Sequence, residues 1–201
     1  MNGYTPGNTP NFYDFNSADD TTEYEIIPKG TLAKVRMTIK PGGYDDQTRG
    51  LTGGWATHKS VSGAIYLNCE AVILEGQYAK RKLWFLIGLH SQKGPEWANM
   101  GRSLIKGILN SAHGLSTKDN SPNAQSARRI SGMGDLDGIV FAAKIDVEKD
   151  MNGNDKNTIK TAITADHKDY ATIMSGGGFN APPQSSNNTP PHTPNVPSWA
   201  Q

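Results

Sequence analysis

The sequence predicts a mainly β domain that also carries helices, and three observations lead to that class. Short stretches alternate apolar and polar residues, which is the pattern of half-buried strands. Turn signals built on Gly, Pro and Asn-Gly separate these stretches. One longer segment repeats its apolar residues at helical spacing. We therefore expect five strands, with a helix between the third and the fourth.

Each element follows from its local pattern. The first strand, 30–40, places Ala33, Val35, Met37 and Ile39 on one face and basic residues on the other. The helix begins at Pro95, in the position that proline favours, and ends before Gly114. A second helix runs from 121 to 130. The other four strands are expected at 64–75, 80–89, 136–148 and 156–164. The Gly-rich segment 41–63 is predicted to be a long loop, and such loops are usually functional or mobile.

Five strands with a helix after the third are the order of an OB-fold. This fold is a small, five-stranded Greek-key barrel that binds oligonucleotides or oligosaccharides. Other small β-barrels and α+β sandwiches have the same element order, so the order alone leaves them open.

The composition divides the chain into three parts. Residues 1–12 are predicted to be a flexible N-terminus, 13–170 the OB-like domain and 171–201 a disordered tail rich in Pro, Asn and Ser. The tail contains no Asp, Glu, Lys or Arg, and it cannot bury enough apolar area to offset its ordering entropy. Trp199 in this tail is either a chance aromatic residue or a short docking motif.

The charge is distributed unevenly along the chain. With 20 Lys+Arg and 19 Asp+Glu among 201 residues, the formal net charge is +1. Residues 1–29 carry a net charge of −4, whereas 30–170 carry +5. This balance excludes a polybasic nucleic-acid packing protein and a strongly acidic solvating protein. It still permits a local basic surface.

The sequence lacks the motifs of several catalytic and metal-binding classes of protein. The single cysteine, Cys69, excludes an intramolecular disulfide and argues against a cysteine-based metal site. Neither a phosphate-binding glycine loop nor a HExxH motif is present, and the five histidines are scattered. We expect no catalytic residue, metal or cofactor. Asp135 and Asp137 leave a metal-dependent nuclease as an alternative, although the same residues more simply form a turn. With no apolar run of membrane length and no signal peptide, the expected compartment is the cytoplasm.

Basic and aromatic residues are interleaved between 29 and 106. Proteins that bind single strands without sequence preference use cations for the phosphates and aromatic faces for the bases. Either Trp84 or Phe85 is expected in the core, since they are adjacent on a strand, and Trp97 belongs to the apolar stripe of the helix. The predicted nucleic-acid-binding residues are Lys34, Arg36, Lys40, Tyr44, Arg49, Trp55, Lys59, Tyr66, Arg81, Lys82 and Trp84.

Several motifs carry a resemblance to a known family. They are the segments 13–15 and 23–30, the stretch 67–70 and, most specifically, Glu75-Gly76-Gln77-Tyr78-Ala79-Lys80-Arg81-Lys82-Leu83-Trp84. Over about 13–165 the chain resembles phage- and prophage-encoded proteins of replication and recombination cassettes, a family of unknown-function domains thought to bind single-stranded DNA on an OB-like fold. The resemblance implies that Arg81, Lys82 and Trp84 lie near a DNA face. One departure is that the tail has no acidic tip for recruiting replication proteins.

These observations set the expected function and partners. The function is sequence-independent binding of single-stranded DNA in phage replication or recombination, in the cytoplasm of the host cell. The partners are single-stranded DNA or RNA, replication or recombination proteins that bind the tail, and further copies of the chain, but no membrane. The alternative is a non-catalytic phage assembly or adaptor protein that acts through protein–protein contacts.

Overall fold

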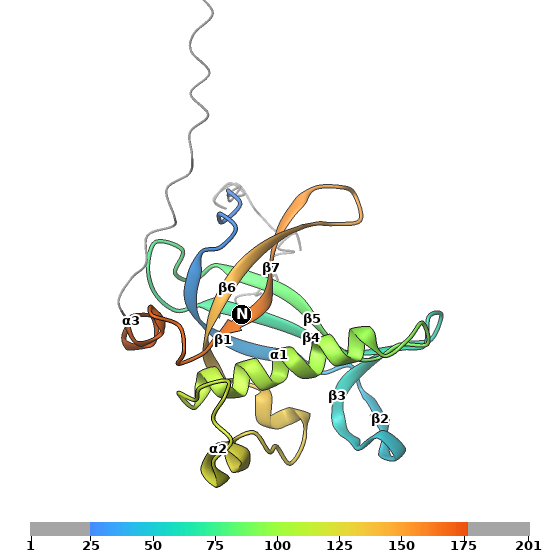
Figure 1. The fold of residues 1–201 in the computed structure, drawn as a ribbon. Coiled ribbons are helices and arrows are strands. Elements are labelled where there is room, and N and C mark those ends of the chain that lie inside the picture. Colours follow the sequence, from blue (N-terminus) through green and yellow to red (C-terminus); the bar gives the residue numbers. More distant parts are fainter. Residues whose placement is uncertain (1–24, 177–201) are drawn as a thin grey trace, which may run out of the picture.

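A curled antiparallel sheet crossed by one long helix forms the body of the protein (Figure 1). The computed structural model describes residues 25–176. Its strands are β1 (Leu32–Lys40), β2 (Tyr44–Asp46), β3 (Leu51–Lys59), β4 (Ala64–Ile73), β5 (Lys82–His90), β6 (Val140–Lys149) and β7 (Asp155–Ile163). Its helices are α1 (Glu96–Ala112), α2 (Pro122–Ala127) and α3 (Tyr170–Ser175), with short 3-10 helices η1 (Gln47–Arg49) and η2 (Met133–Leu136).

The sheet is organised around β4, which has three strand neighbours. On one edge of β4, β1 pairs with residues 68–73 and β3 with residues 64–66. On the other edge, β5 pairs with residues 65–72. β1 continues the sheet through β6 to β7. Among the described strands no pairing joins β5 to β7, so the sheet is a half-barrel with an open seam between these two strands.

The core lies inside the curl, where the alternation predicted for the first strand holds for its neighbours as well. Residues of β4 are buried and partly exposed in strict turn, so one whole face of the strand is apolar and covered. Helix α1 closes the inner side with Ile108 and Leu109. The buried strand residues that meet beneath it include Val35, Met37, Leu67, Cys69, Leu83, Phe85, Ile87, Phe141 and Ile145.

Two predictions about the strands need correction. The structure has seven strands rather than five, because the segment 41–63 folds into β2, η1 and β3 instead of remaining a loop. The helix accordingly lies between the fifth and sixth strands, rather than between the third and fourth. The local sequence hides β3 because Gly53 and Gly54 interrupt it with positive φ angles of 81° and 69°. Pairing with β2 and β4 stabilises a strand that has weak propensity of its own.

Helix α1 crosses the seam of the half-barrel at one end. Its Gly101 packs so closely on β5 that an added Cβ would overlap the carbonyl oxygen of Gly88. Six residues later, a Cβ on Gly107 would lie 3.4 Å from Cβ of Ala162 in β7. The absence of side chains at these two glycines allows one helix to contact both strands that border the seam.

The C-terminal end of the domain also differs from the prediction. The tail was expected to begin at 171, but residues 171–175 belong to α3. Ile173 of this short helix is buried against Ala142 and Ile163, with Tyr170 and Met174 packed beside it. The predicted flexible N-terminus, Trp199 and most of the predicted tail lie outside the described residues. None of the helices within 25–176 is long and apolar enough to cross a membrane.

Candidate nucleic-acid interface

The outer surface of β1, β4 and β5 presents the polar half of the alternating pattern. Because paired residues of antiparallel strands project to the same side, the register places their outward side chains in rows. We call this surface the outer face. Its rows are Arg36–Val72–Lys82, Thr38–Glu70–Trp84 and Lys40–Asn68–Leu86, continued by Tyr66–Gly88 on β4 and β5.

Three cations follow one margin of the outer face. Arg36 is the partner of Val72, Lys40 of Asn68 and Lys59 of Ala64. The β4 positions are four residues apart, so the cations share one side and are spaced by about 13 Å, given a rise of about 3.3 Å per residue. None of the three forms an ion pair with another described residue. This cationic margin is free to meet an anionic polymer.

The other predicted cations have protein partners. Lys34 lies 3.0 Å from the Oε1 atom of Glu75, and Lys82 lies 2.9 Å from that of Glu70. The guanidinium of Arg81 turns toward the seam and donates a hydrogen bond of 3.0 Å to the carbonyl oxygen of Glu25. The structure therefore does not bring Arg81 together with Arg36 and Lys59 on one surface.

Aromatic side chains occupy the middle and far margin of the outer face. Trp84 is 58% exposed, while its neighbour Phe85 is buried, as expected for adjacent strand residues. Tyr66 projects outward, and its ring centroid is 6.2 Å from that of Trp97. Trp97 covers Gly88, where an added Cβ would come within 2.5 Å of the indole ring. The predicted core residue Trp97 is thus partly exposed and borders the interface.

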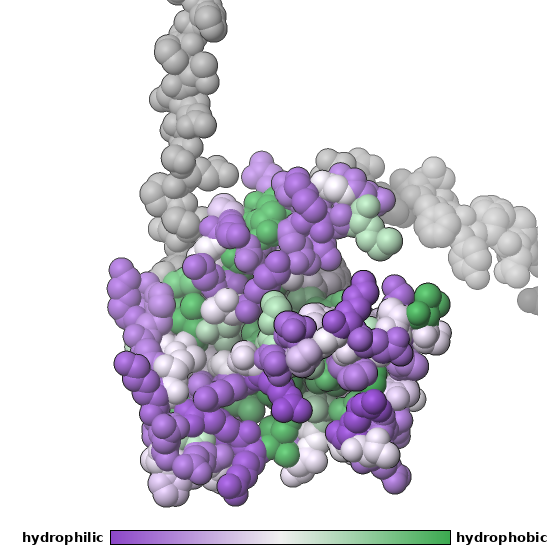
Figure 2. Space-filling model, turned by 45° about the vertical axis from the view of Figure 1, so that its right-hand side comes forward, coloured by the Kyte–Doolittle hydropathy of each residue, from purple (hydrophilic) through white to green (hydrophobic). Residues whose placement is uncertain are grey.

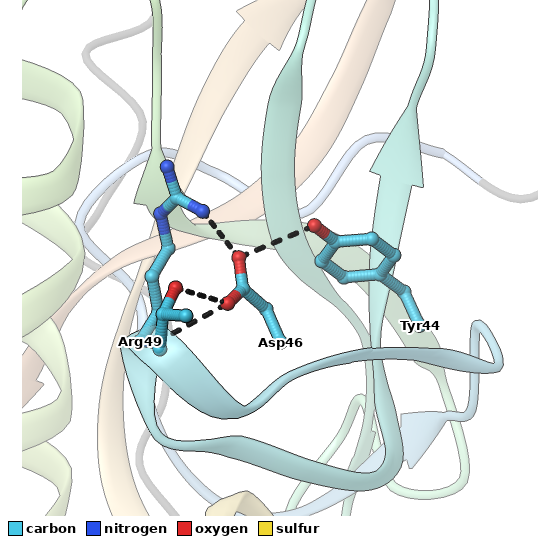
Figure 3. A network of polar contacts seen from close by, with 4 residues as sticks. Tyr44, Asp46 and Arg49 are labelled. Atoms are coloured by element: carbon cyan, nitrogen blue, oxygen red, sulfur yellow. Dashed lines mark hydrogen bonds and ion pairs between the residues drawn. The ribbon is translucent and has the colours of Figure 1, made fainter.

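The hairpin of β2 and β3 extends from the sheet where β3 pairs with the start of β4, and it carries its own polar network (Figure 3). Asp46 accepts hydrogen bonds from the Thr48 hydroxyl at 2.6 Å and from the Tyr44 hydroxyl at 3.4 Å, and it forms an ion pair with Arg49. The Thr48 hydroxyl and the Arg49 guanidinium lower the pKa of Asp46 to about 2. The ring of Tyr44 packs 4.7 Å from that of His58. Arg49 is therefore neutralised within the hairpin.

Trp55 has a structural position in the same hairpin. Its indole ring lies against η2, where a Cβ on Gly134 would be 2.6 Å from Nε1, and it packs on the main core. Of the four predicted aromatic contacts, Tyr66 and Trp84 lie on the outer face, whereas Tyr44 and Trp55 pack against other parts of the protein.

A second surface begins where the outer face meets the seam. A groove of about 1030 Å³ lies between β5, the N-terminal half of α1 and β7. Glu148 on its wall is bonded to Lys156 at 3.1 Å and to Lys160 at 3.0 Å. Burial opposes ionisation of Glu148, but hydrogen bonds from Lys160 and Lys156 outweigh it and lower the carboxyl pKa. One carboxylate shared by two ammonium groups leaves this wall with one excess positive charge.

The acidic pair that suggested a nuclease serves the backbone instead. Asp137 accepts a hydrogen bond of 2.7 Å from the amide of Ile39, and Asp135 accepts one of 2.6 Å from the amide of Ser131. Within residues 25–176, no group of three or more His, Cys, Asp or Glu side chains is placed to hold a metal ion. Cys69 is buried in the core, and this burial, with a smaller effect of Asp137, raises the pKa of its thiol to about 12.

Comparison with known proteins assigns the chain to no family. No family model matches the chain. No curated protein matches it either.

Some residues of the interface escaped the sequence analysis. The predicted binding residues do not include Trp97, Leu86 or the lysines of β7. Gly88 was the available signal for Trp97, because a glycine inside an apolar strand often marks the close approach of another group. Lys156 and Lys160 had no local signal, since only the curl of the sheet brings β7 near β5.

Proposed function

We propose that this protein binds single-stranded DNA without sequence preference on the outer face of an OB-like half-barrel. The observation that carries the proposal is the cationic margin of Arg36, Lys40 and Lys59 beside the partly exposed Tyr66 and the exposed Trp84. The resemblance of the sequence to phage replication and recombination proteins suggests that the protein protects or presents single strands in those processes.

The strand arrangement supports the OB-like interpretation. Without β2 and β3, the sheet order is β5-β4-β1-β6-β7, which is the third, second, first, fourth and fifth strand of the remaining five. This is the strand order of an OB-fold, and α1 then follows its third strand. In OB-folds the second and third strands and the loops after strands one and four bind oligonucleotides. Their counterparts here are β4, β5, the β2–β3 hairpin and the β6–β7 turn.

The geometry suggests how a strand would bind. Phosphates would follow the cationic margin, which extends for about 26 Å along β4 at a rise of about 3.3 Å per residue. Bases would turn inward and stack on Tyr66 and Trp84, each stack contributing about 1–3 kcal/mol. Since aromatic faces and cations do not distinguish bases, the binding would be indifferent to sequence.

A titration of fluorescent oligo-dT at two salt concentrations tests the proposal. Each phosphate neutralised on a single strand contributes about −0.7 to the slope of log affinity against log salt, so three cations predict a slope near −2. Absence of binding at low salt, or binding that is indifferent to salt, would overturn the proposal. Parallel titration with oligo-U determines whether RNA binds equally well.

The remaining alternatives separate in the same assays. A metal-dependent nuclease would shorten the labelled oligonucleotide during incubation with Mg²⁺ or Mn²⁺, whereas we expect it to remain intact. An adaptor that acts through its tail would lack oligo-dT affinity and would lose its protein partner when residues 177–201 are removed.

A further inference from the structure

The groove between β5, α1 and β7 exposes an unusual amount of apolar side chain. Trp84, Leu86 and Met100 are 58%, 51% and 66% exposed, and all three line it. Figure 2 shows hydrophobic residues recessed among hydrophilic ones on the face that it presents. An apolar patch rimmed by polar groups usually marks a binding site. The groove therefore needs an occupant.

Both ends of the groove are defined by named contacts. At one end, α1 crosses from Gly88 to Ala162. At the other end, residues 25–27 cross the seam. Arg81, just before β5, donates a hydrogen bond to the carbonyl oxygen of Glu25, and the side chain of Asn157 in β7 bonds to both the amide and the carbonyl of Ile27, at 2.9 and 2.8 Å. Ile27 is fully buried, so this crossing is anchored in the core.

The chain that precedes this crossing has the composition to fill the groove. Residues 1–24 carry Asp14, Asp19, Asp20 and Glu23 but no Lys or Arg, and they include Phe12, Tyr13 and Phe15. Aromatic side chains match the apolar floor of the groove. Its charged lining residues balance, with Lys156 and Lys160 against Glu148 and Glu96, so the apolar side chains favour this segment.

The tether is long enough for this contact. The ten residues from Phe15 to Glu25 can span about 33 Å when extended. The β5 side of the groove, from Trp84 to Gly88, covers four residues or about 13 Å. Because the segment is attached at the mouth of the groove, its effective concentration there is on the order of millimolar.

We propose that residues 12–24 of the same chain bind in this groove, with Phe12, Tyr13 and Phe15 packed against Trp84, Leu86 and Met100. The C-terminal residues 177–201 are a poorer match. They follow α3, which packs on Ala142 and Ile163 and lies away from the groove (Figure 1).

Hydrogen exchange on the full chain tests the proposal without nucleic acid. We expect F12S/F15S to speed exchange of the amides in residues 82–104 about tenfold, because their cover is lost. The matched variant N8S/N16S changes polar residues of the same segment and is expected to exchange like the parent. Unchanged exchange in F12S/F15S would overturn the proposal. Protection that increases with protein concentration would also overturn it, since a second copy would then occupy the groove.

A disulfide assay gives an independent answer. Cys69 is buried, so introduced cysteines can be read against a silent background. N16C/N99C places one thiol in the N-terminal segment and one on the α1 wall of the groove. We expect it to form an intramolecular disulfide in dilute solution at least tenfold faster than N16C/N123C. Asn123 lies on α2, near the opposite end of α1 (Figure 1). Equal rates for the two pairs would contradict the proposal.

Discussion

The outer face and the groove share β5 but offer different chemistry. On the outer face, β4 is paired along both edges, so its backbone groups are bonded and the side chains alone are available. The groove borders the open seam, where the facing edges of β5 and β7 are not paired with each other or with another described strand. The outer face combines aromatic rings with cations that form no ion pair with another described residue. The groove is an apolar channel in which Lys156 and Lys160 share the carboxylate of Glu148.

This difference teaches that one strand can serve two ligands of different chemistry. Trp84 and Leu86 belong to both surfaces, since they project from the outer face at its boundary with the groove. A nucleic acid on the outer face and a peptide in the groove would therefore compete for these two side chains. Four variants test the comparison, in decreasing order of expected effect.

The largest effect is expected where α1 holds the groove together. G101A forces a methyl group into the carbonyl of Gly88, which should lower the free energy of unfolding by about 3 kcal/mol through overpacking. Urea unfolding followed by circular dichroism measures this loss. G107A in the same helix is the control, because its methyl group meets Ala162 at an ordinary 3.4 Å and alanine favours the helix by up to about 1 kcal/mol. Equal stability of the two variants would contradict the close packing described for Gly101.

The next effect concerns the cationic margin alone. R36A/K40A/K59A should weaken oligo-dT binding about 100-fold at low salt and bring the salt slope about 2 units closer to zero, since three phosphate contacts are lost. Fluorescence anisotropy at several salt concentrations provides both values. K118A removes an exposed lysine from the loop after α1, where the neighbouring Thr117 bonds to Asp166, and should change neither. If the triple variant keeps the parental salt slope, the phosphates bind elsewhere on the protein.

A smaller effect separates the two surfaces at their boundary. W84A should weaken oligo-dT binding about tenfold by removing one base stack, which corresponds to about 1.4 kcal/mol. M100A also removes apolar surface from the groove but does not touch the outer face, so its oligo-dT affinity should not fall below that of the parent. If both variants weaken binding equally, the nucleic acid enters the groove.

The smallest effect concerns the ion pairs on the groove wall. Because the pKa of Glu148 is lowered in the folded state, its pairs stabilise the fold above the unfolded pKa and are lost as the pH falls through the folded value. E148Q should therefore cost no more than about 0.5 kcal/mol at pH 7, as is usual for exposed pairs. Denaturant titrations from pH 7 to pH 3 should show this difference vanish toward acid. A difference that grows toward acid would have the wrong sign.

The sequence predicted most of the elements but not their neighbours. Alternation located β1, β4, β5, β6 and β7 to within a few residues, because each strand buries one face. It missed β2, which has only three residues, and β3, whose glycines give no strand signal. It also missed α3, whose Tyr170, Ile173 and Met174 are too few to define a helical pattern.

The candidate site depended more strongly on tertiary structure. Arg36 and Lys40 could be assigned to one face from β1 alone, but Lys59 joins them only through pairing of β3 with β4. The partners that neutralise Lys34, Arg49 and Lys82 are acidic residues that looked equally exposed in the sequence.

The position of β4 constrains how this chain can change in evolution. Because β4 pairs with β1, β3 and β5, an inserted or deleted residue between 64 and 72 would reverse the inward and outward sides of the strand beyond it. The cationic margin would lose its common side and the core would lose alternate apolar residues in one event. The β6–β7 turn at Met151–Gly153 is exposed. Related chains should therefore vary in length at such turns and keep the length of β4 fixed.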